Sequence, residues 1–151
     1  MARKPHPVLP PGYFLIGLLG VLALDRWVPG SEWIPSPLHH AGWVLIAAGL
    51  WMTVHPSRQF DEAETTVKPH EPSSSLVTEG FFRISRNPMY LGMGLALLGL
   101  AVLLRSLPGL LVPGVFVLLM DLVFIRAEEE LLEERFGEAY HKYREGVRRW
   151  I

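Results

Sequence analysis

Hydrophobic residues are gathered into long runs along this chain, and the polar residues lie in the segments between them. Residues 41–54 contain no charged side chain, and residues 89–125 contain only Arg105 and Asp121. A soluble domain of this size rarely carries so many apolar stretches. The pattern therefore predicts an all-α integral membrane protein with about four transmembrane helices, at residues 12–28, 38–54, 87–104 and 107–125.

The last segment has a different pattern. In residues 126–150 the apolar side chains recur every three or four positions, with charged side chains on the other faces, which predicts an amphipathic helix lying in the cytoplasmic membrane interface. The apolar positions are Leu132, Phe136, Tyr140, Tyr143, Val147 and Trp150. The polar stretch of residues 55–86 is expected to be a long functional loop. Residues 1–151 form a single membrane-embedded domain by length.

The distribution of positive charge predicts the orientation in the membrane. There are two Lys or Arg residues before the first predicted helix, four in residues 55–86 and six from Arg126 onward. The segments on the other side of the predicted membrane contain only Arg26 and Arg105. The positive-inside rule then places both termini and the long loop in the cytoplasm. The chain has no organellar signal, so we expect a multi-pass protein of the bacterial inner (cytoplasmic) membrane.

Composition excludes several function classes. The net charge of −1 and the lack of a basic face argue against a nucleic-acid partner. The chain has no cysteine, which removes disulfides, thiolate nucleophiles and Cys-metal sites. No pair of histidines has the spacing of a metal site, so no metal is expected.

Two polar clusters contain the candidate residues for ligand binding and catalysis. One is Arg86-Asn87-Pro88-Met89-Tyr90-Leu91-Gly92-Met93-Gly94, at the start of the third apolar run, and the other is Glu128-Glu129, just after the fourth. If those two runs form a membrane hairpin, both clusters return to the same face of the bilayer. Asp121 lies seven residues before Glu128 and should share a helix face with it.

These motifs resemble the isoprenylcysteine carboxyl methyltransferase family, which is related to the phospholipid methyltransferases. The resemblance covers roughly residues 58–150. It rests on Thr65-Thr66-Val67-Lys68-Pro69-His70, Leu76-Val77-Thr78-Glu79-Gly80-Phe81-Phe82-Arg83, Arg86-Asn87-Pro88-Met89-Tyr90-Leu91-Gly92, and Glu128-Glu129 followed by Leu132, Phe136-Gly137, Tyr140 and Tyr143. Asn87 departs from the histidine of the eukaryotic branch, and Phe81 departs from a proline common in bacterial relatives.

The resemblance implies an enzyme that binds S-adenosylmethionine at the cytosolic membrane face and takes a lipophilic acceptor from the bilayer. It also implies which positions bind the cofactor: Leu76, Val77, Phe82, Asn87, Pro88, Met89, Tyr90, Gly92, Gly94, Glu128 and Glu129.

The residue types fit this cofactor on physical grounds as well. Arg86 suits the carboxylate of S-adenosylmethionine by bidentate pairing. Glu128 or Glu129 suits its ammonium or ribose hydroxyls, and Tyr90 offers apolar surface for the adenine. Gly92 and Gly94 would allow close backbone approach.

Methyl transfer from an activated donor needs alignment of the acceptor and exclusion of water. A carboxylate acceptor needs no base, whereas an amine must be deprotonated, and His70, Asp121 and Glu64 are candidates for that step. Arg86, Tyr90, His70 and Asp121 are thus the residues expected to act in catalysis.

Other interpretations stay open. Arg86 is also a reasonable membrane anchor, Glu128-Glu129 a solvated helix face, and Gly92 and Gly94 helix-packing residues. An NADPH-dependent membrane reductase of related fold and a non-enzymatic four-helix scaffold are the competing functions. The acceptor, the methylated atom and the oligomeric state are left open by the sequence.

Overall fold

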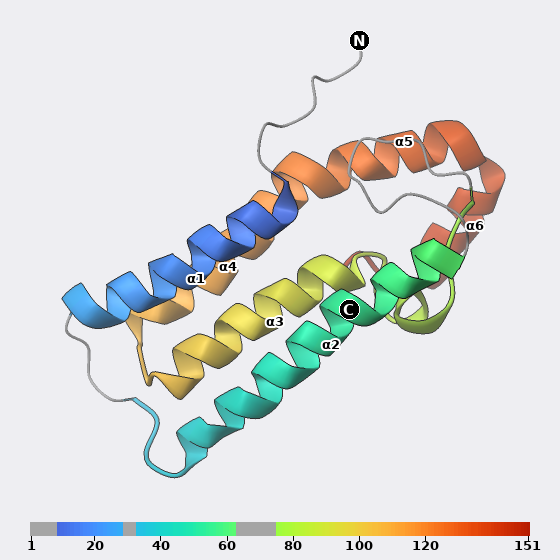
Figure 1. Ribbon diagram of the computed structural model, residues 1–151. Helices are drawn as coiled ribbons and strands as arrows, with labels where there is room; N and C mark the ends of the chain where they lie inside the picture. Colours follow the sequence, from blue (N-terminus) through green and yellow to red (C-terminus); the bar gives the residue numbers. More distant parts are fainter. Residues whose placement is uncertain (1–8, 29–32, 63–74) are drawn as a thin grey trace.

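A computed structural model describes residues 9–28, 33–62 and 75–151, with the backbone alone for residues 57–62 (Figure 1). Every regular element in these ranges is helical, which confirms the predicted all-α class. The main helices are α1 (Pro10–Trp27), α2 (Ala41–Glu62), α3 (Pro88–Leu103), α4 (Leu111–Met120), α5 (Arg126–Phe136) and α6 (Glu138–Gly146). Short 3₁₀ helices are η1 (Leu38–His40), η2 (Gly80–Arg83) and η3 (Pro108–Leu110), and η4 (Asp121–Ile125) is a π-helical turn.

Prolines at the helix starts explain three of the predicted boundaries. Pro10, Pro88 and Pro108 each occupy the first turn of a helix, where the missing N–H costs no hydrogen bond. The third helix ends before Arg105, whose φ of 59° departs from helical geometry. The sequence thus predicted α1, α3 and the α4 region within a few residues.

The predicted end of the second helix at residue 54 was wrong. Helix α2 continues through Pro56 to Glu62, so the stretch expected to be a loop from residue 55 begins as helix. A proline removes one helical hydrogen bond and bends the helix without necessarily ending it. Pro56 is fully buried, so packing contacts favour the continued helix.

The predicted separate interfacial helix at residues 126–150 also needs correction. The chain is one continuous helix from Pro108 to Phe136, since the π-helical turn η4 joins α4 directly to α5. The break comes instead at Gly137, where φ is 49°, a value that favours glycine. Helix α6 follows, and the chain from residue 147 to 151 is not helical.

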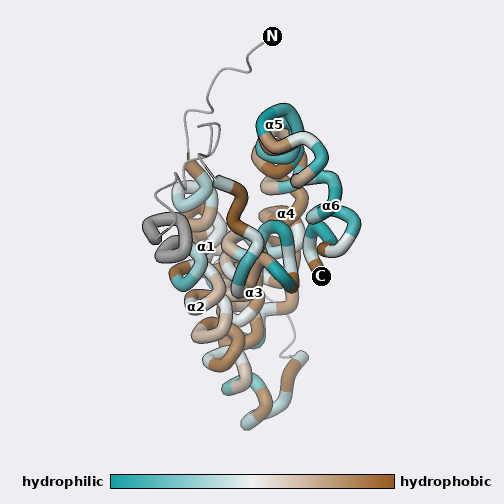
Figure 2. The backbone as a smooth tube through the Cα atoms, turned by 90° about the vertical axis from the view of Figure 1, so that its right-hand side faces the viewer, coloured by the Kyte–Doolittle hydropathy of each residue, from teal (hydrophilic) through white to brown (hydrophobic). Residues whose placement is uncertain are grey.

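The helix Pro108–Phe136 is the one element in the described ranges that is long and apolar enough to cross a membrane, and α3 is a shorter apolar helix. Figure 2 shows the contrast along the molecule: the bundle body is largely hydrophobic, and α5 and α6 are largely hydrophilic. The predicted number of four spans stays a prediction.

Helices α2 and α3 pack antiparallel at very short range. A Cβ built on Gly49 would lie 2.5 Å from the carbonyl oxygen of Gly92, and one built on Gly42 would lie 2.5 Å from that of Gly99. Both pairs are seven residues apart, so each helix presents its two glycines on one face. Larger side chains at these positions would force the helices apart.

On the other face of α3 lie α1 and α4 (Figure 1). A cluster of buried apolar residues joins them, and it extends through η4 toward the start of α5. Its members are Val21, Tyr90, Met93, Leu97, Ala101, Phe116, Met120, Phe124 and Ile125.

Candidate functional site

The two polar clusters meet at the end of the bundle where α3 begins and α5 leaves α4. The Tyr90 hydroxyl donates to Glu128 Oε1 at 2.6 Å, and Arg86 Nη1 lies 3.1 Å from Glu129 Oε1. The side chains of Arg86 and Glu129 are only 10% and 11% exposed. Two stretches that are about forty residues apart in the sequence therefore form one buried polar site.

A second arginine, from the C-terminal tail, completes the contacts of Glu129. Arg149 Nε and Nη2 donate to the two carboxylate oxygens of Glu129 at 3.1 and 2.6 Å. This fork-to-fork geometry is the strongest form of a side-chain ion pair. Glu129 is thus held between Arg86 and Arg149.

Asp121 joins the same network from the π-helical turn. Arg149 Nη1 donates to its Oδ1 at 3.0 Å, and the more exposed Arg126 donates to its Oδ2 at 3.2 Å. We predicted that Asp121 would share a helix face with Glu128, because seven residues make about two α-helical turns. The π-helical turn uses an additional residue, which explains why Asp121 shares Arg149 with Glu129 instead.

Glu128 differs from its neighbour in its partners. Its hydrogen-bond partner within the described residues is the Tyr90 hydroxyl, and no described cation lies within 4.0 Å of it. Tyr90 is itself 8% exposed. The site therefore contains one carboxylate held in place by a neutral donor, beside one that is neutralised by two arginines.

Two tyrosines of α6 form a wall of the site. Arg86 Nη1 donates to the Tyr140 hydroxyl at 3.3 Å, and the Tyr143 hydroxyl donates to the backbone oxygen of Phe82 at 2.7 Å. Burial raises the pKa of both hydroxyls, and the Glu129 charge adds to the rise at Tyr140 while Arg86 opposes it. Both tyrosines therefore stay protonated, and Tyr143 stays a hydrogen-bond donor, across the physiological range.

Arg86 retains an unused donor. Its Nε is buried and has no hydrogen-bond partner among the described residues. A buried donor without an acceptor costs roughly 1–3 kcal/mol, so a ligand carboxylate at this point would be favourable.

The C-terminal tail lies against the segment that precedes α3. The carbonyl of Arg149 accepts hydrogen bonds from Ser85 Oγ at 3.2 Å and Asn87 Nδ2 at 3.0 Å, and the carbonyl of Arg148 accepts one from the Arg86 N–H at 3.0 Å. The Asn87 amide is therefore engaged by the tail. The pKa of Arg149 is raised above its ordinary value, chiefly by its hydrogen bond to Glu129, so Arg149 stays charged.

The remaining predicted positions have mixed surroundings. Phe82 and Pro88 are buried, and Leu76 and Val77 are half-buried in the segment that leads to η2. The carbonyl of Met89 lies 3.4 Å from the Thr53 hydroxyl on α2. His70 and Glu64, the other candidate bases, lie outside the described residues.

Gly92 and Gly94 lie in helix contacts. A Cβ on Gly92 would meet Gly49 O at 2.5 Å, and one on Gly94 would meet Val117 on α4 at 3.1 Å. The geometry supports the packing role for these glycines, and their predicted cofactor role stays a prediction.

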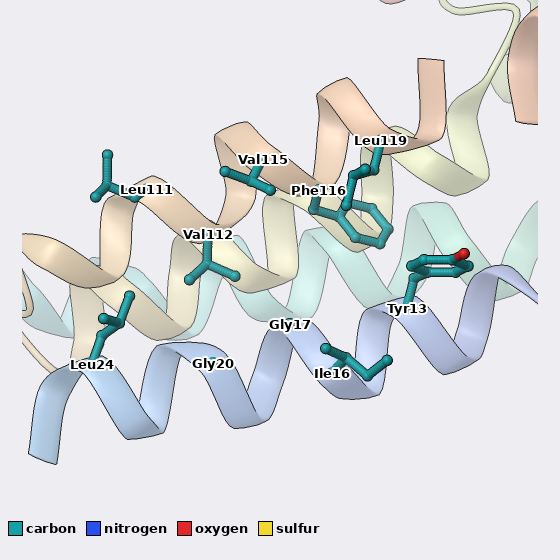
Figure 3. A pocket seen from close by; sticks show the side chains of 10 residues that line it. All are labelled: Tyr13, Ile16, Gly17, Gly20, Leu24, Leu111, Val112, Val115, Phe116 and Leu119. Atoms are coloured by element: carbon teal, nitrogen blue, oxygen red, sulfur yellow. The ribbon is translucent and has the colours of Figure 1, made fainter. Parts of the chain in front are cut away.

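An apolar groove between α1 and α4 leads toward the site. It has a volume of about 280 Å³ and runs from Tyr13 and Leu119 at one end to Leu24 and Leu111 at the other (Figure 3). The Tyr13 ring packs edge-on against Phe124 with 5.7 Å between centroids, and the Phe124 centroid is 6.4 Å from that of Tyr90. The buried ring of Phe124 therefore lies between the Tyr13 end of the groove and Tyr90.

The fold and the site define a helical protein with a buried cluster of polar side chains at one end of an apolar bundle. The sequence model of the phospholipid methyltransferase family matches residues 38–139. The chain therefore belongs to the phospholipid methyltransferase family, as its motifs predicted. It is also 36% identical over 63 residues to an uncharacterized protein of Haemophilus influenzae (strain ATCC 51907 / DSM 11121 / KW20 / Rd), a match that covers 42% of this chain and 100% of that protein.

Three site residues were not assigned from the sequence. Tyr140 and Tyr143 were seen in the motif and in the apolar stripe, but no role was given to their hydroxyls. Arg149 was missed altogether, because nothing in the pattern distinguishes it from the other basic residues of the last segment.

Proposed function

We propose that the protein transfers a methyl group from S-adenosylmethionine to a lipophilic acceptor at the cytoplasmic face of the membrane. Family membership supports methyl transfer to a lipid-like molecule. The observation that carries the proposal is the joining of the two motif clusters through the Tyr90–Glu128 and Arg86–Glu129 contacts. This site offers both a carboxylate and an arginine donor to a zwitterionic ligand.

The two glutamates are proposed to have different roles. Glu129 is neutralised by two arginines, so its role is to hold Arg86 in place. Glu128 makes no ion pair with a described residue, so it is the carboxylate proposed to bind the ammonium of the cofactor. The buried Nε of Arg86 is proposed to donate to the cofactor carboxylate.

The chain's own contribution to the reaction is binding, alignment and exclusion of water. When bound, S-adenosylmethionine supplies an activated methyl group that an acceptor nucleophile displaces from sulfur. Tyr90 fixes the direction of the Glu128 carboxylate through its short hydrogen bond. Asp121 is engaged by two arginines, so we propose a positioning role for it. His70 is then the proposed base for an amine acceptor.

The groove between α1 and α4 is proposed to hold the hydrocarbon chain of the acceptor. Its lining is almost entirely apolar, and its Tyr13 end lies one ring away from Tyr90. From Tyr13 to Leu24, α1 rises about 16 Å, roughly half of the hydrocarbon thickness of a bilayer. An acceptor lying in the groove would present its head to the site and its chain to the membrane.

The membrane arrangement is part of the proposal. We infer four spans, formed by α1, α2, α3 and the apolar part of Pro108–Phe136, with both termini in the cytoplasm of a bacterial inner membrane. The excess of Lys and Arg in the tail and in the segment after α2 supports this orientation.

Calorimetric titration of the detergent-solubilised protein tests the cofactor assignment. We expect S-adenosylmethionine and its demethylated product to bind and NADPH not to bind. Glu128→Gln should weaken binding of both by at least about tenfold, since a charge-assisted hydrogen bond contributes about 1.5–3 kcal/mol. Glu130→Gln is the matched control, because Glu130 is an exposed glutamate of the same helix.

The alternatives give different results in the same titration. Binding of NADPH alone would move the protein to the reductases. Failure of a folded sample to bind any of the three would favour the non-enzymatic scaffold.

A further inference from the structure

The C-terminal tail, residues 147–151, is attached to the site by contacts from both its backbone and its side chains. Its backbone accepts hydrogen bonds from Arg86 N–H, Ser85 Oγ and Asn87 Nδ2, so it runs along the segment that carries the start of the Arg-Asn-Pro-x-Tyr motif. Ser85 is fully buried and Asn87 is 9% exposed. These hydrogen bonds are therefore shielded from water.

The side chain of Arg149 connects this segment to the other half of the site. Its guanidinium binds both oxygens of Glu129 on α5 and one oxygen of Asp121 in η4. Arg149 thus joins two parts of the chain that are far apart in the sequence, the segment before α3 and the helix Pro108–Phe136. Trp150 adds a further anchor, since its side chain packs against the buried apolar cluster.

Through Glu129, the position of Arg149 also determines the position of Arg86. Glu129 Oε1 is shared between Arg86 Nη1 and Arg149 Nε, while Oε2 belongs to Arg149 alone. If Arg149 were absent, Arg86 would be free to take both oxygens and to leave its hydrogen bond with Tyr140. The guanidinium would then turn away from its present position.

We propose that the C-terminal tail is a structural part of the ligand site and that Arg149 is its positioning residue, which orients Arg86 through Glu129. This inference rests on the proposed function, because the ligand that Arg86 receives is S-adenosylmethionine in that proposal. The tail lies beyond residues 38–139, so the family match does not reach it.

Carboxypeptidase trimming tests attachment of the tail without any ligand. In the wild-type chain of residues 1–151 the tail should resist digestion, as followed by intact mass. Arg149→Gln should lose its last residues at least about tenfold faster. Arg148→Gln is the matched control, since it removes the same charge from the neighbouring exposed residue and leaves the backbone contacts in place.

Calorimetric titration with S-adenosylmethionine tests the positioning role. We expect Arg149→Gln to raise Kd about tenfold with the binding stoichiometry unchanged, Arg149→Lys to raise it less, and Arg148→Gln to match the wild type. Lysine keeps the positive charge but cannot form the bidentate pair with Glu129, so a Kd between those of the wild type and Arg149→Gln indicates a positioning role. A merely structural role would instead lower the stoichiometry at constant Kd.

Several results would overturn the inference. An unchanged Kd for Arg149→Gln, or an equal rise for Arg148→Gln, would exclude a positioning role for Arg149. If the wild type binds neither S-adenosylmethionine nor its product, the proposed function fails and the positioning role with it, while the trimming comparison still decides whether Arg149 attaches the tail.

Discussion

At the scale of single residues, the two adjacent glutamates of the site have different partners. Glu129 is neutralised by two arginines and serves as a fixed centre, whereas Glu128 is held by the Tyr90 hydroxyl. Removing one partner of a buried ion pair leaves an uncompensated charge and is costly. Substitutions of Glu129 will therefore report on folding as well as on binding, and Glu128 and Tyr90 are the more informative pair.

Tyr90→Phe should weaken binding of S-adenosylmethionine about tenfold. The substitution removes one hydroxyl and leaves the ring, so the cost is the loss of the hydrogen bond that directs Glu128, worth about 1.5 kcal/mol. Calorimetry on Tyr90→Phe, Glu128→Gln and the double variant measures the coupling. Since Tyr90 acts through Glu128, the double variant should bind about as weakly as Glu128→Gln alone, and additive losses would contradict this role.

The sequence predicted the principal residues of the site but not the contact that Arg149 of the C-terminal tail makes with them. Arg86, Tyr90, Glu128 and Glu129 stand out as motif residues beside apolar runs, and the structure brings them together. The contact of Arg149 depends on the turn at Gly137 and on the tail folding back, which are long-range events that a local periodicity does not contain. Asp121 was expected on the helix face of Glu128, but it shares Arg149 with Glu129, because a π-helical turn alters the register by one residue.

At the scale of the elements, the close approach of α2 and α3 positions the start of α3 and hence Tyr90. Four glycines allow backbone contact between these helices, with Gly42 opposite Gly99 and Gly49 opposite Gly92. Small residues at such crossings are the usual basis of helix association in membranes.

Gly92→Ala should destabilise the protein by about 1–3 kcal/mol. The new Cβ would lie 2.5 Å from Gly49 O and 2.6 Å from Thr53 Oγ1, so α2 must move away. Thermal unfolding in detergent checks this, with Gly114→Ala as the control, because a Cβ at Gly114 meets nothing within 4 Å. Equal unfolding temperatures for the two variants would show that the contact is looser than described.

Gly20→Leu should block the groove between α1 and α4. A Cβ at Gly20 would lie 3.7 Å from Val112, so the longer side chain can enter the groove without a backbone clash. A C16 fatty acid with a terminal diazirine should cross-link to α1 and α4 in the wild type, as mapped by mass spectrometry. The yield should fall severalfold in Gly20→Leu.

The control for the groove is Gly114→Leu, which places the same side chain on α4 in open space. Cross-linking in this variant should match the wild type. Equal yields in both variants and the wild type would mean that ordinary bilayer lipid, and not a bound chain, occupies the surface.

The element boundaries show where sequence patterns succeed. Apolar runs beginning with proline predicted α1 and α3 closely, because hydropathy and helix-start signals coincide there. The predicted end of α2 was wrong because Pro56 and the polar residues after it were interpreted as a helix terminus. A buried proline is compatible with a continuing helix. The continuity of α4 with α5 was missed because the composition changes at Arg126 while the helix does not end.

At the scale of the whole molecule, hydrophobic and hydrophilic parts are segregated (Figure 2). Helices α5 and α6 carry the charged residues beyond one end of an apolar bundle, and the site lies where the two parts join. A water-soluble cofactor and a lipophilic acceptor could meet at such a junction. The proposed orientation has this end in the cytoplasm.

Single cysteines test the orientation, because the natural chain has none. Glu138 is an exposed residue at the start of α6, and Leu107, at the opposite end of the bundle, is 47% exposed. A membrane-impermeant maleimide should label Leu107→Cys in spheroplasts and Glu138→Cys only after the membrane is permeabilised. The reverse pattern would place the site outside the cytoplasm.

Transfer of tritium from methyl-labelled S-adenosylmethionine to the organic extract of bacterial membranes tests the central claim most directly. Membranes that contain the wild-type protein should give labelled material in that extract, Glu128→Gln should reduce it at least about tenfold, and Glu130→Gln should leave it unchanged. Label at the level of membranes lacking the protein, or equal label with Glu128→Gln, would contradict methyl transfer at this site.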